Sequence, residues 1–482
     1  MSGRAATTVV QPGDVALAVG DPGTKPPEGW AWVPLRKLAE MATGHTPSRR
    51  VPEYWGGDIP WISVKDARLV DGAVIYETRE NTNRIGIENS AAVVLPPNTV
   101  CLSRTASIGY SVRLGRPMAT SQGFVNWRCG EELLPEYLQY LFLAENRFLK
   151  RIAEGAAQTS IYLPAAKAFH VCVPSLAMQR RIVEVVKATR EQVARAVSGL
   201  HGPQRKLERL LQSVLREAFS GRLTQEWRES RVVRDTALEE LEEIRQAVTS
   251  NGTSRELRYF EELIRAHPPS RDEELPSSWA RTQIGHMGHI YRGSTPARKE
   301  PAYWGGEIPW VSSGEVRNNV ISESRERISD QGLSNSSCRL MPPGSVLVAL
   351  SGEGRTRGQS AVLDINACFN QSVAAIDLSH GRSNSLYLRY WLQYRYQDTR
   401  QSGSGSAQRG LSTQRVRELP LHLAPLREQI EIVRRIDEVA SAIQNARSRS
   451  SAMIDSLGQL ERSVLRRAFA GELVPTAAST RL

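Results

Sequence analysis

Ser213-Val-Leu-Arg-Glu-Ala-Phe-Ser-Gly-Arg-Leu223 returns 250 residues later as Ser463-Val-Leu-Arg-Arg-Ala-Phe-Ala-Gly-Glu-Leu473, with eight of the eleven positions identical. A match of this length indicates an internal duplication. Each copy reads as the end of a helix, because Gly221 and Gly471 follow an apolar run and glycine readily adopts the left-handed conformation that closes a helix. The sequence therefore predicts two equivalent long helices.

Apolar residues recur every seven positions upstream of each copy, which is the pattern of helices packed along a stripe. We assign the following residues to this contact: Val186, Val193, Leu207, Val214 and Phe219 in the first helix, and Ile436, Ile443, Leu457, Val464 and Phe469 in the second. A second seam is expected three residues after the first, at Ala196, Leu210, Val439, Ala446, Met453 and Leu460. Pro203 lacks a backbone donor, so the first helix is predicted to kink or break near it.

The duplication extends through the segments that precede both helices. Tyr54-Trp-Gly-Gly-Asp-Ile-Pro-Trp-Ile-Ser63 corresponds to Tyr303-Trp-Gly-Gly-Glu-Ile-Pro-Trp-Val-Ser312, and Gly44-His-Thr-Pro47 to Gly293-Ser-Thr-Pro296. Short apolar runs separated by Pro, Gly and Asn predict mixed domains of strands and helices. The expected order is a flexible tail at 1–27, a first domain at 28–175, a helix at 176–223, an acidic helical linker at 224–276, a second domain at 277–424, a helix at 425–473 and a tail at 474–482.

The net charge of +11 favours a polyanionic partner such as nucleic acid, although a merely basic soluble protein is equally compatible with charge alone. Residues 235–274 hold eleven acidic residues and five arginines, a net charge of −6, so the rest of the chain carries +17. The acidic stretch is interpreted as a solvated face or as a contact for a partner protein.

No catalytic constellation is recognisable in the sequence. It contains no phosphate-binding loop with a Gly-Lys-Ser/Thr ending, no His-Glu-x-x-His and no Cys/His cluster. The five cysteines are odd in number and scattered, which favours a reducing cytoplasm over a disulfide framework. No apolar run reaches the length of about 20 residues that a membrane span needs, so we expect a cytoplasmic protein without a membrane contact.

Basic pairs precede the aromatic block in both copies, at Arg49-Arg50 and Arg298-Lys299. Their duplicated placement predicts a shared electrostatic role, most simply contact with a phosphate backbone. The tryptophans of the block could stack on bases, but we favour a place in the domain cores, because the Gly-Gly between them indicates a tight turn with close packing. These residues are Trp55, Trp61, Trp304 and Trp310.

Further candidates for DNA contact lie in small polar loops that follow strands. Arg104, Arg355 and Arg357 could donate to phosphates or base edges, or could be solvated loop residues. Gln122, Asn370 and Gln371 carry amides that can contact adenine, but they suit turns and strand caps equally well.

Taken together, these motifs resemble those of the specificity subunits of type I restriction-modification systems, the HsdS family. The resemblance rests on the duplicated aromatic block, on the Pro-Pro turns at Pro96-Pro97 and Pro342-Pro343, on Pro425-Leu-Arg-Glu-Gln429 at a helix start, and on the two Ser-Val-Leu-Arg-x-Ala-Phe-x-Gly endings. It covers roughly residues 28–223 and 277–473.

The resemblance implies an α+β fold with two tandem target-recognition domains, separated by two long helices that form an antiparallel coiled coil with pseudo-twofold arrangement. It implies a chain without catalytic activity, in which each domain reads one half of a bipartite, asymmetric site in double-stranded DNA and the helices set the spacer. Two methyltransferase (M) subunits would bind it and methylate adenine with S-adenosylmethionine. Restriction (R) subunits would add cleavage that depends on ATP and Mg²⁺. No cofactor or metal is expected in this chain.

Two other functions remain open from the residues themselves. A self-contained nuclease or methyltransferase would need an Asn/Asp-Pro-Pro-Tyr/Phe motif or an acidic metal cluster, and the sequence shows neither. A coiled-coil scaffold without base readout would bind DNA with an affinity that follows salt but not sequence.

Overall fold

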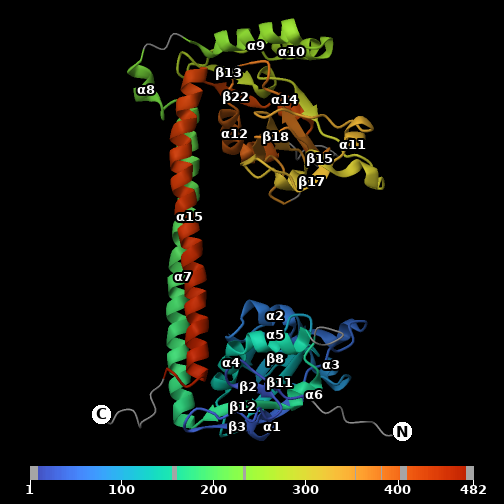
Figure 1. Cartoon of the computed structure of the whole chain (residues 1–482), viewed down its shortest axis with the longest axis vertical. Coiled ribbons are helices and arrows are strands. Elements are labelled where there is room, and N and C mark those ends of the chain that lie inside the picture. The colour runs from blue at the N-terminus through green and yellow to red at the C-terminus, as the bar shows by residue number, and fades with distance from the viewer. Residues whose placement is uncertain are drawn as a thin grey trace. The chain divides into compact units, whose positions relative to one another are not determined.

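A computed structural model describes residues 9–154, 160–231, 235–352, 354–381, 383–401 and 410–473. The chain divides into two compact units: unit 1 comprises Met1–His201 and Ser450–Leu482, and unit 2 comprises Gly202–Arg449. Each unit contains one duplicated domain and a segment of both long helices, α7 (Leu176–Phe219) and α15 (Leu426–Phe469) (Figure 1). The predicted class, two tandem sheet-containing domains with two long helices, is confirmed.

The described residues of unit 1 form three small sheets. Its strands are β1 (Gln11–Pro12), β2 (Leu17–Val19), β3 (Trp30–Pro34), β4 (Ala39–Thr43), β5 (Trp55–Ile62), β6 (Val74–Ile75), β7 (Asn81–Thr82), β8 (Val100–Ser103), β9 (Ser111–Leu114), β10 (Ala119–Thr120), β11 (Phe124–Cys129) and β12 (Phe169–Pro174). Its short helices are α1 (Leu35–Leu38), η1 (Pro52–Tyr54), α2 (Val64–Leu69), α3 (Arg84–Glu88), α4 (Pro135–Ala144), α5 (Asn146–Glu154) and α6 (Leu163–Lys167).

Unit 2 repeats this design with an added helical segment. Its strands are β13 (Ala280–Gln283), β14 (Ile290–Arg292), β15 (Trp304–Val311), β16 (Asn319–Ile321), β17 (Glu326–Ile328), β18 (Val346–Ala349), β19 (Ser360–Leu363), β20 (Cys368–Phe369), β21 (Val373–Ile376) and β22 (Pro420–Leu423). Its other helices are α8 (Gln225–Glu229), α9 (Ala237–Asn251), α10 (Ser254–Ala266), η2 (Ile284–His286), η3 (Pro301–Tyr303), η4 (Ser313–Glu315), α11 (Asp330–Ser334), α12 (Ser385–Tyr394), α13 (Tyr396–Gln401) and α14 (Thr413–Arg417).

The five-stranded sheets of the two units have the same topology. The strand order β4-β11-β8-β9-β6 in unit 1 corresponds to β14-β21-β18-β19-β16 in unit 2. Both faces of these sheets are covered, because Val100 and Leu102 of β8 join the larger core with α4 and α5 while Cys101 joins a smaller cluster on the other face. Burial on both faces explains why the strands read as continuous apolar runs in the sequence.

The N-terminal segment predicted as a flexible tail contributes two strands to unit 1. β1 and β2 extend the sheet of β12 and β3, and Leu17 and Ala18 are fully buried. The buried carboxylate of Glu145 accepts hydrogen bonds from the backbone N–H groups of four successive residues, Asp14 to Leu17, at 2.6–3.2 Å. The expectation of a tail through residue 27 was therefore wrong, because a side chain far along the sequence satisfies this backbone.

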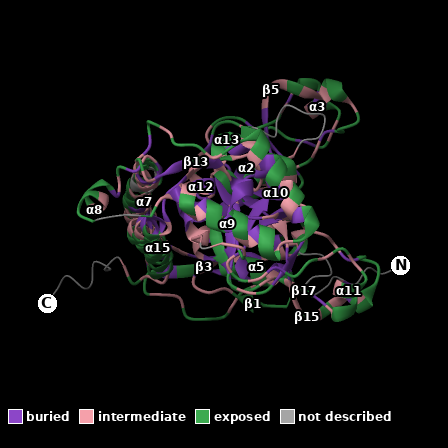
Figure 2. Ribbon diagram, turned by 90° about the horizontal axis from the view of Figure 1, so that it is seen from above, coloured by how far each residue is buried: buried purple, intermediate pink, exposed green. Residues whose placement is uncertain are grey.

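The acidic linker is also part of a domain. α9 and α10 form the predicted pair of helices, and each turns one face into the core of unit 2 through Leu241, Ile244, Phe260 and Leu263 (Figure 2). Glutamates such as Glu239, Glu242 and Glu243 lie on the exposed side of α9. The interpretation as a solvated face thus holds for the exposed side of these helices, while their apolar side packs on unit 2.

In each unit, segments of α7 and α15 lie side by side. In unit 1, Arg190 Nη1 lies 3.3 Å from Glu461 Oε1. In unit 2, Arg447 pairs with Glu208 and Arg435 donates to the carbonyl of Leu223, so the two helices run in opposite directions. These contacts define a paired helical spine within each unit.

The first predicted seam lies inside this pairing, whereas the second is displaced. Val186, Val193, Ile436 and Ile443 are buried, and Leu207, Val214, Leu457 and Val464 are half-buried. Leu210, Met453 and Leu460, expected in the second seam, are 48–57% exposed. The second contact lies four residues after the first, where Arg190, Leu211, Arg447 and Glu461 occur. Because three of these residues are charged, a search for apolar periodicity passes over them.

The sequence predicted a kink or a short break near Pro203, and of these the break is absent, because α7 is helical without interruption through this residue. A proline removes one backbone donor, and this local loss is outweighed by the intact hydrogen bonds on both sides of it. α7 and α15 consequently have the same length of 44 residues.

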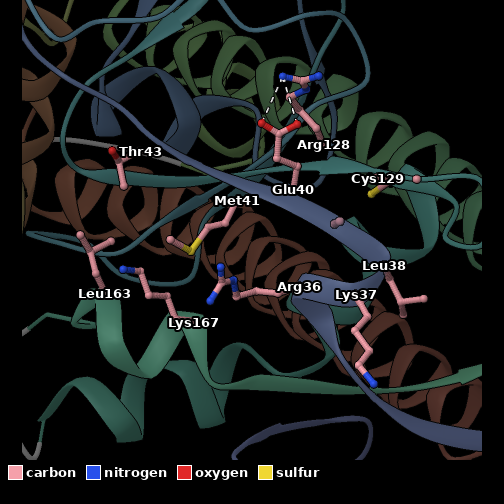
Figure 3. Close-up of a pocket in the computed structure, with 12 residues that line it drawn as sticks. Arg36, Lys37, Leu38, Glu40, Met41, Thr43, Arg128, Cys129, Leu163 and Lys167 are labelled. Carbon is pink, nitrogen blue, oxygen red and sulfur yellow. Dashed lines mark hydrogen bonds and ion pairs between the residues drawn. The ribbon is translucent and has the colours of Figure 1, made fainter. Parts of the chain in front are cut away.

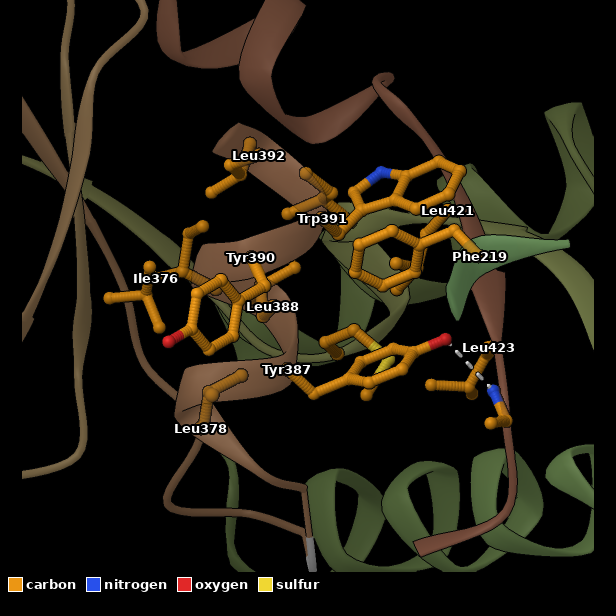
Figure 4. Close-up of a cluster of buried hydrophobic side chains, with 14 of the residues drawn as sticks. Phe219, Ile376, Leu378, Tyr387, Leu388, Tyr390, Trp391, Leu392, Leu421 and Leu423 are labelled. Atoms are coloured by element: carbon orange, nitrogen blue, oxygen red, sulfur yellow. Dashed lines mark hydrogen bonds between the residues drawn. The ribbon is translucent and has the colours of Figure 1, made fainter. Parts of the chain in front are cut away.

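The duplicated helix ends anchor the helices, because each buries a phenylalanine in the core of a unit. Phe219 is buried in unit 2 against the rings of Tyr387 and Trp391, with centroid distances of 5.3 and 5.1 Å (Figure 4). Phe469 is buried in unit 1 against Tyr137 at 4.9 Å. Each helix therefore starts beside its own domain and ends in the core of the unit that holds the other. Gly221 and Gly471 close the helices with φ of 77° and 78°, as predicted.

Candidate nucleic-acid interface

The aromatic block forms the central strand of a three-stranded sheet in each unit. β5 pairs with β10 and β7, and β15 pairs with β20 and β17, with the same bulge in both. Gly56 and Gly305 adopt φ of 81° and 78°, which disfavours other residues at these positions. A Cβ on Gly57 would come within 2.4 Å of Asn83, so this glycine also permits close packing.

Arg49 and Arg298 are held by aromatic rings and a carboxylate. The guanidinium of Arg49 lies 4.7 Å from the ring centroid of Trp55 and donates to both carboxylate oxygens of Glu80 at 2.7 and 2.8 Å. Arg298 repeats the arrangement over Trp304 at 3.9 Å and with Glu326. The hydrogen bonds from the arginines hold the pKa values of Glu80 and Glu326 below their usual range. Both arginines fix the loop that carries them.

The tryptophans also fix this loop. Trp61 and Trp310 are buried, and their Nε1 atoms donate to the carbonyls of His45 and Ser294 at 3.0 and 3.1 Å. Trp55 and Trp304 are half-buried and donate to the carbonyls of Ser48 and Ala297. The interpretation that favoured a packing role over base stacking agrees with these contacts.

Arg50 and Lys299 follow the fixed arginines and differ from them. Both are exposed, and neither forms a hydrogen bond or ion pair with another residue in the part of the chain that the structure describes. Their charges are thus available to solvent at equivalent places in the two domains.

Gln122 and Gln371 are exposed beside the same loops. The hydroxyl of Thr46 donates to Gln122 Oε1, and the hydroxyl of Thr295 donates to Gln371 Oε1. Because the oxygen of each amide faces the threonine, the Nε2 group is directed elsewhere and can donate to a ligand. Sequence reasoning missed both threonines, although the shared Gly-x-Thr-Pro at 44–47 and 293–296 was a signal for them.

The remaining candidates for DNA contact differ in how far they are bound to the rest of their domain. Asn370 Oδ1 accepts from the backbone of Ser372 at 3.1 Å, which is the turn-capping alternative. Arg104 is half-buried, donates to the carbonyl of Ile161 at 3.3 Å, and has a pKa lowered by desolvation. Arg355 is exposed and Arg357 half-buried in the loop before Gly358.

Three loops meet at one end of each five-stranded sheet. In unit 1 the backbone N–H of Arg104 donates to the carbonyl of Gly123 at 2.8 Å, and that of His45 donates to Thr120 at 2.9 Å. In unit 2 the N–H of Leu350 donates to Ser372, and that of Ser294 donates to Phe369. The structure therefore brings the candidates of each domain together into one loop cluster.

The described residues contain no group of three or more His, Cys, Asp or Glu side chains that could hold a metal ion. No helix among them is both long and apolar enough to cross a membrane. The geometry thus defines a tandem repeat of one mixed domain, joined by long helices and presenting the same polar loop cluster twice.

A family model described as the type I restriction modification DNA specificity domain matches residues 27–194 and 276–450. These matches cover more than half of the chain, which therefore belongs to this family of type I specificity subunits.

Two curated relatives illustrate the relationship. The MjaIX specificity subunit of Methanocaldococcus jannaschii is 24% identical over 357 residues, covering 74% of each chain. The EcoR124I/EcoR124II specificity subunit of Escherichia coli is 28% identical over 164 residues, covering 32% of this chain and 39% of that one. A solved structure from work on assembly and conformational transition of the type I R-M system superposes with a TM-score of 0.63 at 19% identity, covering 93% of this chain and all of that one. The structural likeness supports the fold.

Proposed function

We propose that each domain of this specificity subunit reads one half of a bipartite, asymmetric sequence in double-stranded DNA. The supporting observation is the duplicated loop cluster, in which an exposed cation and a threonine-held glutamine recur on the same scaffold in both domains. Cations at such positions suit phosphates, and a fixed amide suits a base edge. A scaffold without base readout would have no need to hold the amide in one orientation.

The long helices would set the spacer between the two half-sequences and dock two methyltransferase subunits. In this proposal the chain does no chemistry itself. The methyltransferase subunits bind S-adenosylmethionine and methylate adenine, and restriction subunits use ATP and Mg²⁺ for cleavage. The complex acts in the cytoplasm.

The proposal is tested by reconstituting the chain with its methyltransferase subunit and mapping methylated adenines on genomic DNA by long-read sequencing. We expect methylation at one bipartite motif, and none from either protein alone. A chimaera that takes residues 30–175 from a relative should change one half of the motif only. Methylation without this chain, or a change in both halves, would contradict the proposal.

A further inference from the structure

A groove of about 870 Å³ lies on unit 1 along α1, β4 and α6, and its lining includes Thr43, the last residue of β4 before the loop that carries Arg49. Its floor includes the apolar side chains of Leu38 and Met41, and its rim is basic (Figure 3). Arg128 on the rim pairs with Glu40 at 3.3 Å.

Three further cations of this groove are unpaired. Arg36, Lys37 and Lys167 are exposed, and within the described residues none of them forms an ion pair or hydrogen bond. Figure 3 shows Arg36 and Lys167 side by side along the groove, with the nitrogen of Lys167 directed away from Arg36. Three unpaired cations around one groove give it a positive potential, which favours an anionic partner.

Unit 2 shows what covers the equivalent face. Its elements η2, β14 and α14 correspond to α1, β4 and α6 by their place in the repeat, at offsets of 249 or 250 residues. There the face is not open, because α10 of the inserted segment lies on it. Phe260 of α10 packs against the His286 ring at 5.8 Å, and Leu263 lies over Gly285.

Polar contacts hold α10 in this place. The guanidinium of Arg417 lies 3.3 Å from the ring centroid of Tyr259, and Tyr291 donates its hydroxyl to Glu256. Arg417 occupies the position that Lys167 occupies in unit 1. The same face of the repeat is therefore built to receive a helix, and unit 2 supplies that helix from its own chain.

The residues that differ between the two faces indicate which side chains a helix bound to the groove of unit 1 would need. Arg36 stands where unit 2 has Gly285, and Lys37 stands where it has His286. A helix over unit 1 must therefore present carboxylates where α10 presents Leu263 and Phe260, while still offering apolar side chains to Leu38 and Met41.

We propose that the groove of unit 1 binds an amphipathic helix with an acidic face, supplied by the methyltransferase subunit. This proposal rests on the proposed function, which brings that subunit to the chain. The apolar floor and the carboxylate of Glu40 favour a protein helix over a phosphate backbone, which would leave the floor uncovered.

The test uses the full chain reconstituted with its methyltransferase subunit and a DNA duplex that carries the motif. The photo-reactive residue p-benzoylphenylalanine is placed at Lys37 or Lys167, and at Lys65 of α2 as a control outside the groove. We expect adducts from positions 37 and 167 to map to an acidic amphipathic helix of the methyltransferase subunit, and the control position to give none there.

A second measurement uses charge reversal. Arg36→Glu, Lys37→Glu and Lys167→Glu together should lower the affinity for the methyltransferase subunit by roughly 10-fold or more, because like charges would then face each other. The matched control, Lys65→Glu, Arg68→Glu and Arg84→Glu, reverses three exposed charges in the same unit and should leave this affinity unchanged. Circular dichroism checks that both variants remain folded.

Unchanged affinity in the groove variant, or adducts from positions 37 and 167 that form on DNA, would overturn the proposal. Methylation by the wild-type complex distinguishes failure of the groove proposal from failure of the proposed function. If the motif is methylated and the groove variant assembles normally, only the groove proposal fails. If the wild-type chain does not bind the methyltransferase subunit, both proposals fail.

Discussion

The two units share their sheets and loops but complete their edges differently. In unit 1 the edge beside β12 is extended by β1 and β2, whose backbone is held by the buried Glu145. In unit 2 the sheet of β13 and β22 has only two strands among the described residues, and the buried Glu428 joins Thr224, Arg228 and Trp279 beside the start of α15. The two units thus share the topology of the sheet that carries the loop cluster, whereas each edge has a support of its own.

The anchors at the helix ends provide the strongest test of this comparison. Phe219→Ala and Phe469→Ala each remove a buried ring and should cost about 3–5 kcal/mol. Phe219→Ala should weaken amide protection in unit 2, and Phe469→Ala in unit 1, as measured by hydrogen exchange with mass spectrometry. Tyr76→Ala removes an exposed aromatic side chain, so it serves as the control and should have little effect. Equal loss of protection in both units from either anchor variant would contradict the assignment.

The added helices should make the stability of unit 2 depend on pH. Burial, with smaller effects from neighbouring carboxylates, raises the pKa of Glu240 on α9 from 4.5 to about 7. Because the folded state holds this proton more tightly than the unfolded state, unit 2 should lose stability as pH rises from about 4.5 to 7. Glu240→Gln should remove this part of the slope, whereas Glu262→Gln, at an exposed carboxylate of α10, should not. Thermal unfolding at about pH 5 and about pH 7.5 measures the difference, and an unchanged slope in Glu240→Gln would refute the cause.

A smaller effect, on base discrimination, is expected at the threonine–glutamine hydrogen bond that both units share. Thr46→Val and Thr295→Val remove the hydroxyls that orient Gln122 and Gln371, at a cost of roughly 1 kcal/mol, or about fivefold, in base discrimination. Thr46→Val should relax one half of the methylated motif and Thr295→Val the other, while the serine variants keep the hydroxyl and the specificity. Methylome sequencing measures the result. Loss of specificity in both halves from one variant would contradict independent reading by the two domains.

The smallest effect concerns the exposed cations. Arg50→Ala or Lys299→Ala removes one phosphate contact, so the slope of log affinity against log salt should fall by about 0.9 for each variant. DNA binding by the reconstituted complex at several salt concentrations measures the slope. A variant that changes sequence preference without changing the slope would assign that residue to base contact instead.

The duplication, the mixed domains and the two helices could be predicted from the sequence because these features depend on local patterns. Heptad spacing located the seam at Val186 and Ile436, and the repeated glycines located both helix ends. Such features can be read from neighbouring residues alone.

The predictions from sequence were wrong or incomplete where a segment is held by a residue that is distant in the sequence or charged. The backbone before and within β2 is hydrogen-bonded to Glu145, about 130 residues away. This partner cannot be predicted from a local sequence pattern. The second seam contains Arg190 and Glu461, which pair only after the helices meet. In the loop clusters, Gln122 was predicted from its chemistry, but Thr46 was missed because its role appears only when two distant loops come together.

The anchoring of Phe469 in unit 1 has a consequence for synthesis of the chain. Tyr137 leaves the ribosome more than 300 residues before the ring that packs against it, so the domain made first is the last to obtain its complete core. Unit 2, in contrast, already has Phe219 available when Tyr387 emerges. A nascent chain interrupted within α15, just after residue 449, would thus carry every residue of the second lobe but lack Phe469 of the first, which makes completion of translation itself a condition for two working lobes.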